Sequence, residues 1–275
     1  MFLSQSRGVI KVSGADAAKF LHNITTNDVL QMESPSAVYN LILNSKGRFL
    51  FDFFLIKCDK HFLLDCEREA IMPIIELLRL YRVVLKVKIK SCDEYSIALD
   101  TKQRLGDPGY TKTLEDGTVV FQDPRCINMG VRCIVPNTSS VKYYIPTLQS
   151  NTEYSMLRMV NTIPNCATDM VSGESFPLHF GLDKLNAISH TKGCYTGQEV
   201  VARMHRIGAK KTLCTVFSKS GISLPQTGEI FVNQQCVGEM IASTENWGLC
   251  MLETSKLPTG YIDLSIGDIK LSLQS

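Results

Sequence analysis

The sequence of 275 residues lacks several features that define common classes of protein. No apolar run approaches the roughly 18–20 residues that a membrane-spanning helix needs. No Cys-x-x-Cys pair occurs, and no two of the five histidines have the spacing of zinc-finger ligands, so a structural zinc site is not expected. The net charge of only +2 excludes a strong general attraction to nucleic acid or to an acidic membrane.

A targeting segment is also missing from the start of the sequence. Residues 1–14 have neither the charged start and long apolar core of a secretory signal nor the arginine-rich amphipathic form of an organelle presequence. Ten cysteines are spread over the chain, mostly in apolar, strand-like surroundings, which indicates reduced thiols in a reducing compartment. We therefore expect a protein of the bacterial cytoplasm, without a membrane partner and without a metal site of its own.

The hydrophobic pattern predicts an α+β fold with mostly antiparallel sheets. Apolar runs over 37–43 and 48–57 flank Asn-Ser-Lys-Gly, which predicts a hairpin with Gly47 at the permissive position. Helical spacing of apolar residues indicates helices within 14–28 and over 67–81.

The length indicates more than one module. We expect a first α+β part over 1–100 and a second over 101–208. Beyond residue 208 the sequence consists of short apolar runs separated by turn residues, and this pattern predicts a small β-barrel over 209–275.

One thiol stands among polar and flexible neighbours, in Lys-Gly-Cys-Tyr-Thr-Gly-Gln-Glu at 192–199. Thr196 and Glu199 fit a capping box, so the spacing predicts a helix with Thr196 as its N-cap. Cys194 would then lie about two residues before a helix N-terminus, where partial positive charge favours a thiolate.

Neighbouring residues would add to this effect. Lys192 and Arg203 would bring positive charge near the thiol, and Gly193 would let the backbone bend or a ligand approach. The residues alone give equal weight to two interpretations: Cys194 is a reactive group, or it fills a gap at the start of a helix.

The same eight residues resemble the K-G-C-[FY]-x-G-Q-E signature of the YgfZ family. These folate-binding proteins are related to the glycine-cleavage T-protein and assist the assembly or repair of iron–sulfur clusters. The resemblance extends over nearly the whole chain, through Gly14-Ala15-Asp16, Thr26-Asn27-Asp28-Val29, Lys46-Gly47-Arg48, Asp123-Pro124-Arg125, Met129-Gly130-Val131-Arg132, Pro177 and Asp183. It implies a T-protein-like, multi-domain ring that includes a small C-terminal β-barrel.

The sequence departs from the family pattern at three positions. Gly181 stands where asparagine is usual, and His190 stands where phenylalanine is usual. Val160 stands where many relatives have a glutamate. In the T-protein, that glutamate is similar to a pterin-binding group.

The resemblance implies an iron–sulfur cluster assembly or repair factor that binds tetrahydrofolate or a related folate. Cys194 would be the essential reactive group, and it could bridge a cluster in transit if a partner supplied the remaining sulfurs. Iron–sulfur carrier or client proteins and a folate are the expected partners.

Two alternative functions belong to other classes of protein. A tetrahydrofolate-dependent aminomethyltransferase is disfavoured, because only Asp52 follows the hairpin where the T-protein has a pair of aspartates. The other is a scaffold or a helper of tRNA modification with an inert thiol. Direct nucleic-acid binding is not expected, because the basic run over 203–211 has no interleaved aromatic residues.

Further residues are expected at the ligand site. Lys46 and Arg48 either attract an anionic ligand or form a solvated hairpin tip. Tyr154 and Tyr195 could offer a flat apolar platform. Asp52 is either a catalytic carboxylate or a strand residue paired with Lys46 or Arg48. The expected site, in full, comprises Cys194 as the catalytic residue with Lys192, Gly193, Tyr195, Gly197, Gln198, Glu199, Arg203, Asp183, Tyr154, Lys46, Arg48 and Asp52.

Overall fold

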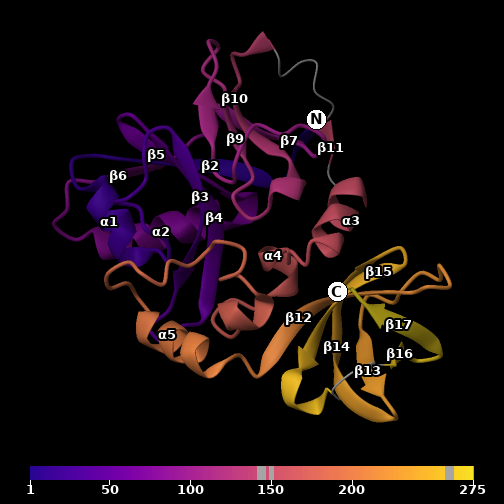
Figure 1. Cartoon of the computed structure of the whole chain (residues 1–275). Helices are drawn as coiled ribbons and strands as arrows, with labels where there is room; N and C mark the ends of the chain where they lie inside the picture. Colours follow the sequence, from indigo (N-terminus) through magenta and orange to yellow (C-terminus); the bar gives the residue numbers. More distant parts are fainter. Residues whose placement is uncertain (141–146, 149–151, 258–262, 275) are drawn as a thin grey trace. The chain divides into compact units, whose positions relative to one another are not determined.

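The computed structural model describes residues 1–140, 147–148, 152–257 and 263–274 (Figure 1). The chain divides into two compact units. The first unit comprises residues 1–150 and 183–198, and the second comprises 151–182 and 199–275. The three ranges inferred from the sequence stay a prediction.

The first unit contains an antiparallel sheet of five strands in the order β3-β4-β5-β2-β6. Its hairpin forms as predicted, and Gly47 at its turn has a positive φ of 68°. The strands are β2 (Arg7–Ser13), β3 (Ser36–Leu43), β4 (Phe49–Cys58), β5 (His61–Glu67) and β6 (Lys88–Ser91).

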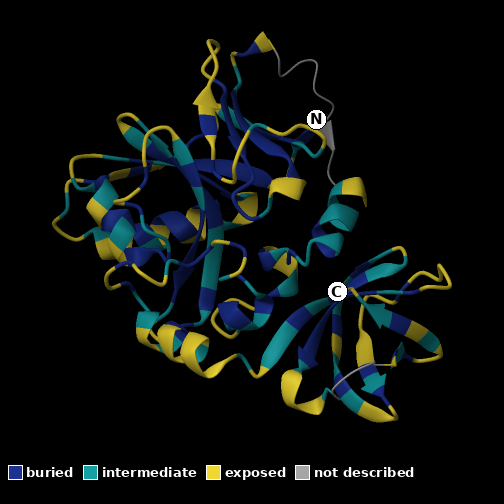
Figure 2. Ribbon diagram, viewed as in Figure 1, coloured by how far each residue is buried: buried dark blue, intermediate teal, exposed yellow. Residues whose placement is uncertain are grey.

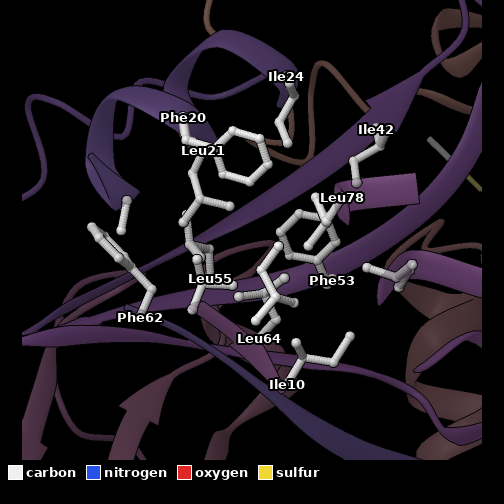
Figure 3. Packing of buried hydrophobic residues seen from close by; sticks show 14 of the residues in the cluster. Ile10, Phe20, Leu21, Ile24, Ile42, Phe53, Leu55, Phe62, Leu64 and Leu78 are labelled. Atoms are coloured by element: carbon white, nitrogen blue, oxygen red, sulfur yellow. The ribbon is translucent and has the colours of Figure 1, made fainter. Parts of the chain in front are cut away.

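Two helices pack on this sheet. The predicted helices are confirmed with shorter bounds, as α1 (Ala17–Ile24) and α2 (Ile71–Arg82), and the 3₁₀ turn η1 (Arg68–Ala70) precedes α2. One fully buried cluster joins the helices to the sheet (Figure 3). It contains Phe20 and Leu21 of α1, Leu78 of α2, and Phe53 and Leu64 of the sheet. This core fixes α1, whose C-terminal end is part of the site described below.

A second sheet completes the first unit, with six strands in the order β11-β1-β7-β10-β9-β8. Its pairs are antiparallel except for β1 with β11, which are parallel. Its elements are β1 (Phe2–Ser4), β7 (Tyr95–Asp100), β8 (Thr111–Thr113), β9 (Val119–Gln122), η2 (Ile127–Met129), β10 (Val131–Pro136) and β11 (Thr147–Leu148).

The second unit contains the predicted barrel. It is closed, in the order β12-β15-β14-β13-β16-β17. Its strands are β12 (Lys211–Phe217), β13 (Gly228–Val232), β14 (Gln235–Thr244), β15 (Trp247–Glu253), β16 (Leu264–Ile266) and β17 (Ile269–Leu273), with η5 (Thr254–Lys256) after β15. Before the barrel come α3 (Thr152–Val160), α4 (Cys166–Asp169), η4 (Pro177–Phe180) and α5 (Gln198–Ile207).

Burial follows this architecture. Strands are mostly buried or half-buried, and many connecting loops are exposed (Figure 2). Among the described residues, none of the helices combines the length and the apolar character needed to cross a bilayer.

Candidate functional site

The loop that carries the thiol is anchored by a buried lysine. The ammonium group of Lys192 donates hydrogen bonds to the backbone oxygens of His22 at 2.5 Å, Thr25 at 2.7 Å and Asn27 at 2.9 Å. These carbonyls lie at or just beyond the C-terminal end of α1, where a helix leaves its last oxygens unpaired and where positive charge is favourable. Burial lowers the pKa of Lys192 to about 8.

This geometry gives Lys192 an anchoring role that was not predicted. An ammonium group has three N–H donors, and all three of Lys192 point to backbone oxygens. Its charge is therefore committed to the end of α1 and to the ring of Tyr195, whose centroid lies 5.1 Å from the nitrogen. Tyr195 is itself buried, which raises the pKa of its hydroxyl to about 12. In this structure Lys192 acts on Cys194 by holding the loop in place.

The helix after the motif begins later than predicted. Gly197 has a φ of +83°, which is not helical, so α5 starts at Gln198 and Thr196 is not its N-cap. The cause is a tertiary contact. A Cβ on Gly197 would lie 2.5 Å from the backbone oxygen of Asn44 and 2.9 Å from the Cα of Gly47. Only glycine permits this approach of the motif to the hairpin turn.

The structure thus brings the Lys46–Arg48 hairpin next to the motif, as expected. Asn44 shapes the turn, since its side-chain oxygen accepts hydrogen bonds from the backbone N–H groups of Lys46 at 2.9 Å and Arg48 at 3.0 Å. Lys46 is exposed and Arg48 is half-buried. Two cationic side chains are therefore carried on a turn that contacts Gly197.

Between these two anchors lies the thiol. All ten cysteines fall in the described part of the chain, and Cys194 alone among them is exposed. Gly193 is also exposed, and a Cβ added to it would meet nothing within 4 Å. On the far side, the backbone N–H of Gln198 donates to the Tyr195 oxygen at 3.2 Å. The sulfur is reachable from solvent on a loop that is fixed on both sides.

The segment before the motif is joined to the loop after α1. The hydroxyl of Thr26 donates to the Ala187 oxygen at 2.6 Å, and the side-chain amide of Asn27 donates to the Asn186 oxygen at 2.7 Å. The backbone N–H of Ser189 donates to the Thr26 oxygen at 3.0 Å. These contacts give the Thr-Asn-Asp sequence near the N-terminus a structural role in seating the motif.

A cleft of about 480 Å³ opens beside this segment. Its lining includes Asn27 and Tyr39, together with His190 and Thr191, which directly precede Lys192. The remaining lining residues are Ala37, Val38, Pro108, Pro124, Asn186, Ile188 and Ser189. His190, at a position where the family usually has phenylalanine, therefore makes this cleft more polar.

Asp52 lies on β4 and is half-buried. Its carboxylate accepts a hydrogen bond from the Tyr39 hydroxyl at 2.9 Å, a partner that was not predicted, and the pairing with Lys46 or Arg48 stays a prediction. Burial raises the pKa of Asp52, against the hydrogen bond from Tyr39 and the charges of Arg7 and Arg125, which lower it.

A buried ionic cluster in the first unit was not predicted from the sequence. Asp65 of β5 accepts from the Nε of Arg7 at 2.8 Å and from the Nη2 of Arg132 at 2.7 Å. Asp123 accepts from the Nη2 of Arg125 at 2.8 Å. Burial alone would raise the pKa of Asp65, but the charges of Arg132 and Arg7 hold it below its usual value.

The ring of Phe54 lies at the centre of these guanidinium groups. Its centroid is 4.0 Å from the Arg132 carbon, 4.8 Å from that of Arg125 and 5.6 Å from that of Arg7. Arg7 and Phe54 belong to the first sheet and Arg132 to the second, so the cluster joins the two sheets of the first unit. Three of the five charged residues of this cluster, Asp123, Arg125 and Arg132, come from the Asp-Pro-Arg and Gly-Val-Arg sequences, which the sequence analysis gave only as family motifs.

Iron–sulfur cluster assembly factors from several organisms resemble this chain along most of its length. The iron–sulfur cluster assembly factor IBA57, mitochondrial, of Homo sapiens is 29% identical over 279 residues, which covers 93% of this chain and 78% of that protein. The Mus musculus protein of the same name is 28% identical and covers 94% and 79%. The Dictyostelium discoideum homologue is 30% identical and covers 74% of this chain and 59% of its own length. None of the established protein-family models matches the sequence.

The fold has a solved counterpart. The crystal structure of the glycine cleavage system aminomethyltransferase T from Bartonella henselae superposes with a TM-score of 0.79 and covers 100% of this chain and 84% of that one, at 12% identity. The chain is similar to the IBA57 proteins in sequence and to the T-protein in fold. This confirms the predicted family and the T-protein-like fold, with its antiparallel sheets and closed C-terminal barrel.

The structure shows the consequence of two of the departures from the family pattern. Gly181 has a φ of +66°, in the left-handed region that glycine and asparagine both adopt, so the backbone requirement is kept. Val160, at the end of α3, supplies no carboxylate for a pterin.

The other predicted residues are distributed between the units. Tyr154 on α3 and the exposed Glu199 and Arg203 on α5 belong to the second unit, and half-buried Asp183 begins the returning segment of the first. Apart from Val201, α5 has no buried residue (Figure 2).

Proposed function

We propose that this chain is an iron–sulfur cluster assembly factor and that Cys194 is its reacting group. The observation that carries the proposal is the exposure of this one thiol, out of ten, on a loop fixed by Lys192 and Gly197. The names of the IBA57 relatives support the assembly role. Those relatives are mitochondrial by name, and a cytoplasmic location for this chain stays a prediction.

The chemistry requires a thiolate, because iron in a cluster binds sulfur in its deprotonated form. Cys194 can supply one such sulfur, and the cluster is cargo that passes through the site. Partner proteins with further cysteines would supply the other ligands during transfer. An iron–sulfur carrier and a client protein are therefore the expected partners.

Folate does not fit the cleft beside the motif as an ordinary pterin ligand. A pterin presents adjacent N–H donors that a carboxylate accepts together, and the lining residues of the cleft include no carboxylate. No step of the proposed function passes through a folate. Folate binding, and with it the aminomethyltransferase alternative, stays a prediction of the family resemblance.

The test is maturation of a cluster-dependent client enzyme in an anaerobic reconstitution with Cys194→Ser. We expect the client's recovered activity to fall at least about tenfold, with the melting temperature unchanged because the side chain is exposed. Cys236→Ser is the matched control, since Cys236 is the half-buried thiol of the barrel strand β14 and belongs to the other unit. Full maturation by Cys194→Ser would favour the scaffold alternative.

A further inference from the structure

The C-terminal end of α2 leads into an exposed apolar surface. Leu80 is 72% exposed, Val83 81% and Val84 88%. Five of the thirteen large hydrophobic side chains that are exposed in the described part of the chain fall within residues 72–84, so they form a patch instead of being scattered singly. We call Leu80, Val83 and Val84, with the adjoining Arg79, Arg82, Lys86 and Lys88, the α2 surface.

Packing within the first unit does not require this surface to be apolar. Ile74, Ile75 and Leu78 of α2 are buried against the sheet, while Met72 and Leu80, eight positions apart, lie on the opposite, exposed side of the helix. An apolar outer face next to a complete core is a feature of helices that bind a partner.

The surface contains a hollow of about 410 Å³, lined by Gly14, Ala15 and residues 82–88. Hydrogen bonds hold the backbone of two of its lining residues, Leu85 and Lys86. The carboxylate of Asp16 accepts a hydrogen bond from the backbone N–H of Lys86 at 2.7 Å, and the N–H of Leu85 donates to the Arg82 oxygen at 2.9 Å. The hollow is therefore part of a structured loop and can receive a side chain.

Val83 adds a sign of function. Its φ of +37° is an outlier for a β-branched residue, and such strain is held only where the surrounding structure imposes it. The loop that imposes it keeps both Val83 and Val84 in solvent, although either could lower its free energy by burial.

The charges around the patch are mostly positive. Arg79, Lys86 and Lys88 are exposed and Arg82 is half-exposed, whereas the acidic groups nearby are Glu76 of α2 and Asp16. A second copy of this chain would bring like charges together across a two-fold contact, which disfavours self-association. A partner with acidic side chains would be attracted.

We propose that the α2 surface binds an acidic segment of a partner protein, which places an apolar side chain in the hollow. Leu80, Val83 and Val84 are aliphatic and Tyr81 is the one exposed aromatic residue within 72–84, whereas a single-stranded nucleic acid is bound on several aromatic stacking platforms, so the surface favours protein. A concave hollow favours a protein side chain over a lipid bilayer. This inference goes beyond the cluster role and does not depend on Cys194.

The test uses a labelled peptide that alternates glutamate with leucine and phenylalanine, and its counterpart with lysine in place of glutamate. We expect the acidic peptide to bind the whole chain and to bind less tightly as salt is added. The double variants Leu80→Ser with Val84→Ser, and Lys86→Glu with Lys88→Glu, should each raise the Kd about tenfold or more. Ile222→Ser, an exposed apolar change in the other unit, should leave the Kd unchanged.

Melting temperatures of the surface variants should match the parent chain, because the side chains are exposed. Cys194→Ser should bind the peptide normally, which separates this proposal from the cluster role. The proposal is overturned if both peptides bind equally, or if neither double variant weakens binding. It is also overturned if the chain self-associates through this face. Sedimentation with phosphatidylglycerol vesicles, without binding of the acidic peptide, would overturn it as well.

Discussion

Replacing Lys192 by methionine should destabilise the first unit. The change keeps an unbranched side chain that is one atom shorter, but it removes three charge-assisted hydrogen bonds to the oxygens of His22, Thr25 and Asn27. Lys192 is only 5% exposed, so water cannot readily replace the lost donors. Hydrogen bonds from a charged group contribute roughly 1.5–3 kcal/mol each, but the three share one ion whose burial is itself costly. We expect a net loss of about 2–4 kcal/mol.

The assay is urea unfolding together with hydrogen exchange read by mass spectrometry. Exchange should increase in two segments far apart in sequence, the end of α1 near Thr25 and the motif loop near Cys194, since Lys192 joins them. Lys184→Met is the matched control, because Lys184 is exposed on the same returning segment. Unfolding within about 0.5 kcal/mol of the parent chain, with unchanged exchange in both segments, would refute the anchoring role.

Two further changes test the backbone and the buried charges. Gly197→Ala should cost about 1–3 kcal/mol and displace the hairpin turn, because it places a Cβ against Asn44 at a positive φ, whereas Gly193→Ala should be nearly neutral in thermal unfolding. Equal melting temperatures for the two glycine variants would contradict this. Asp65→Asn should cost about 3–5 kcal/mol, because it removes the carboxylate charge that Arg7 and Arg132 share and leaves them only Glu67 and Asp123 as counter-ions. The pKa of Asp65 is lowered on folding, so its contribution is complete above its unfolded pKa and is lost as pH falls through the lower folded value. The variant's unfolding free energy should therefore depend less on pH below about 4, and an unchanged acid profile would count against the cluster.

Much of the fold could be predicted from short-range patterns. The hairpin follows from two apolar runs around a turn sequence, and both its strands and the position of Gly47 are confirmed. The barrel follows likewise from repeated short strands. Each of these features depends on residues close together in the chain, where periodicity and turn chemistry act directly.

The site was less predictable, because its defining contacts join distant residues. Lys192 donates to carbonyls more than 160 positions away, so its anchoring role could not be predicted from its sequence neighbours. The start of α5 was misplaced because Gly197 responds to the hairpin at Asn44 and not to the capping residues beside it. Asp65 and Arg132 lie in different sheets, and only the packing of the two sheets brings them together.

Native mass spectrometry under anaerobic conditions tests directly whether Cys194 is a cluster ligand. When the chain is mixed with a cluster-loaded carrier protein, the account predicts a complex that retains iron and sulfide with the parent chain and with Cys236→Ser, and loses them with Cys194→Ser. Retention of the same cluster by a complex that contains Cys194→Ser would contradict it.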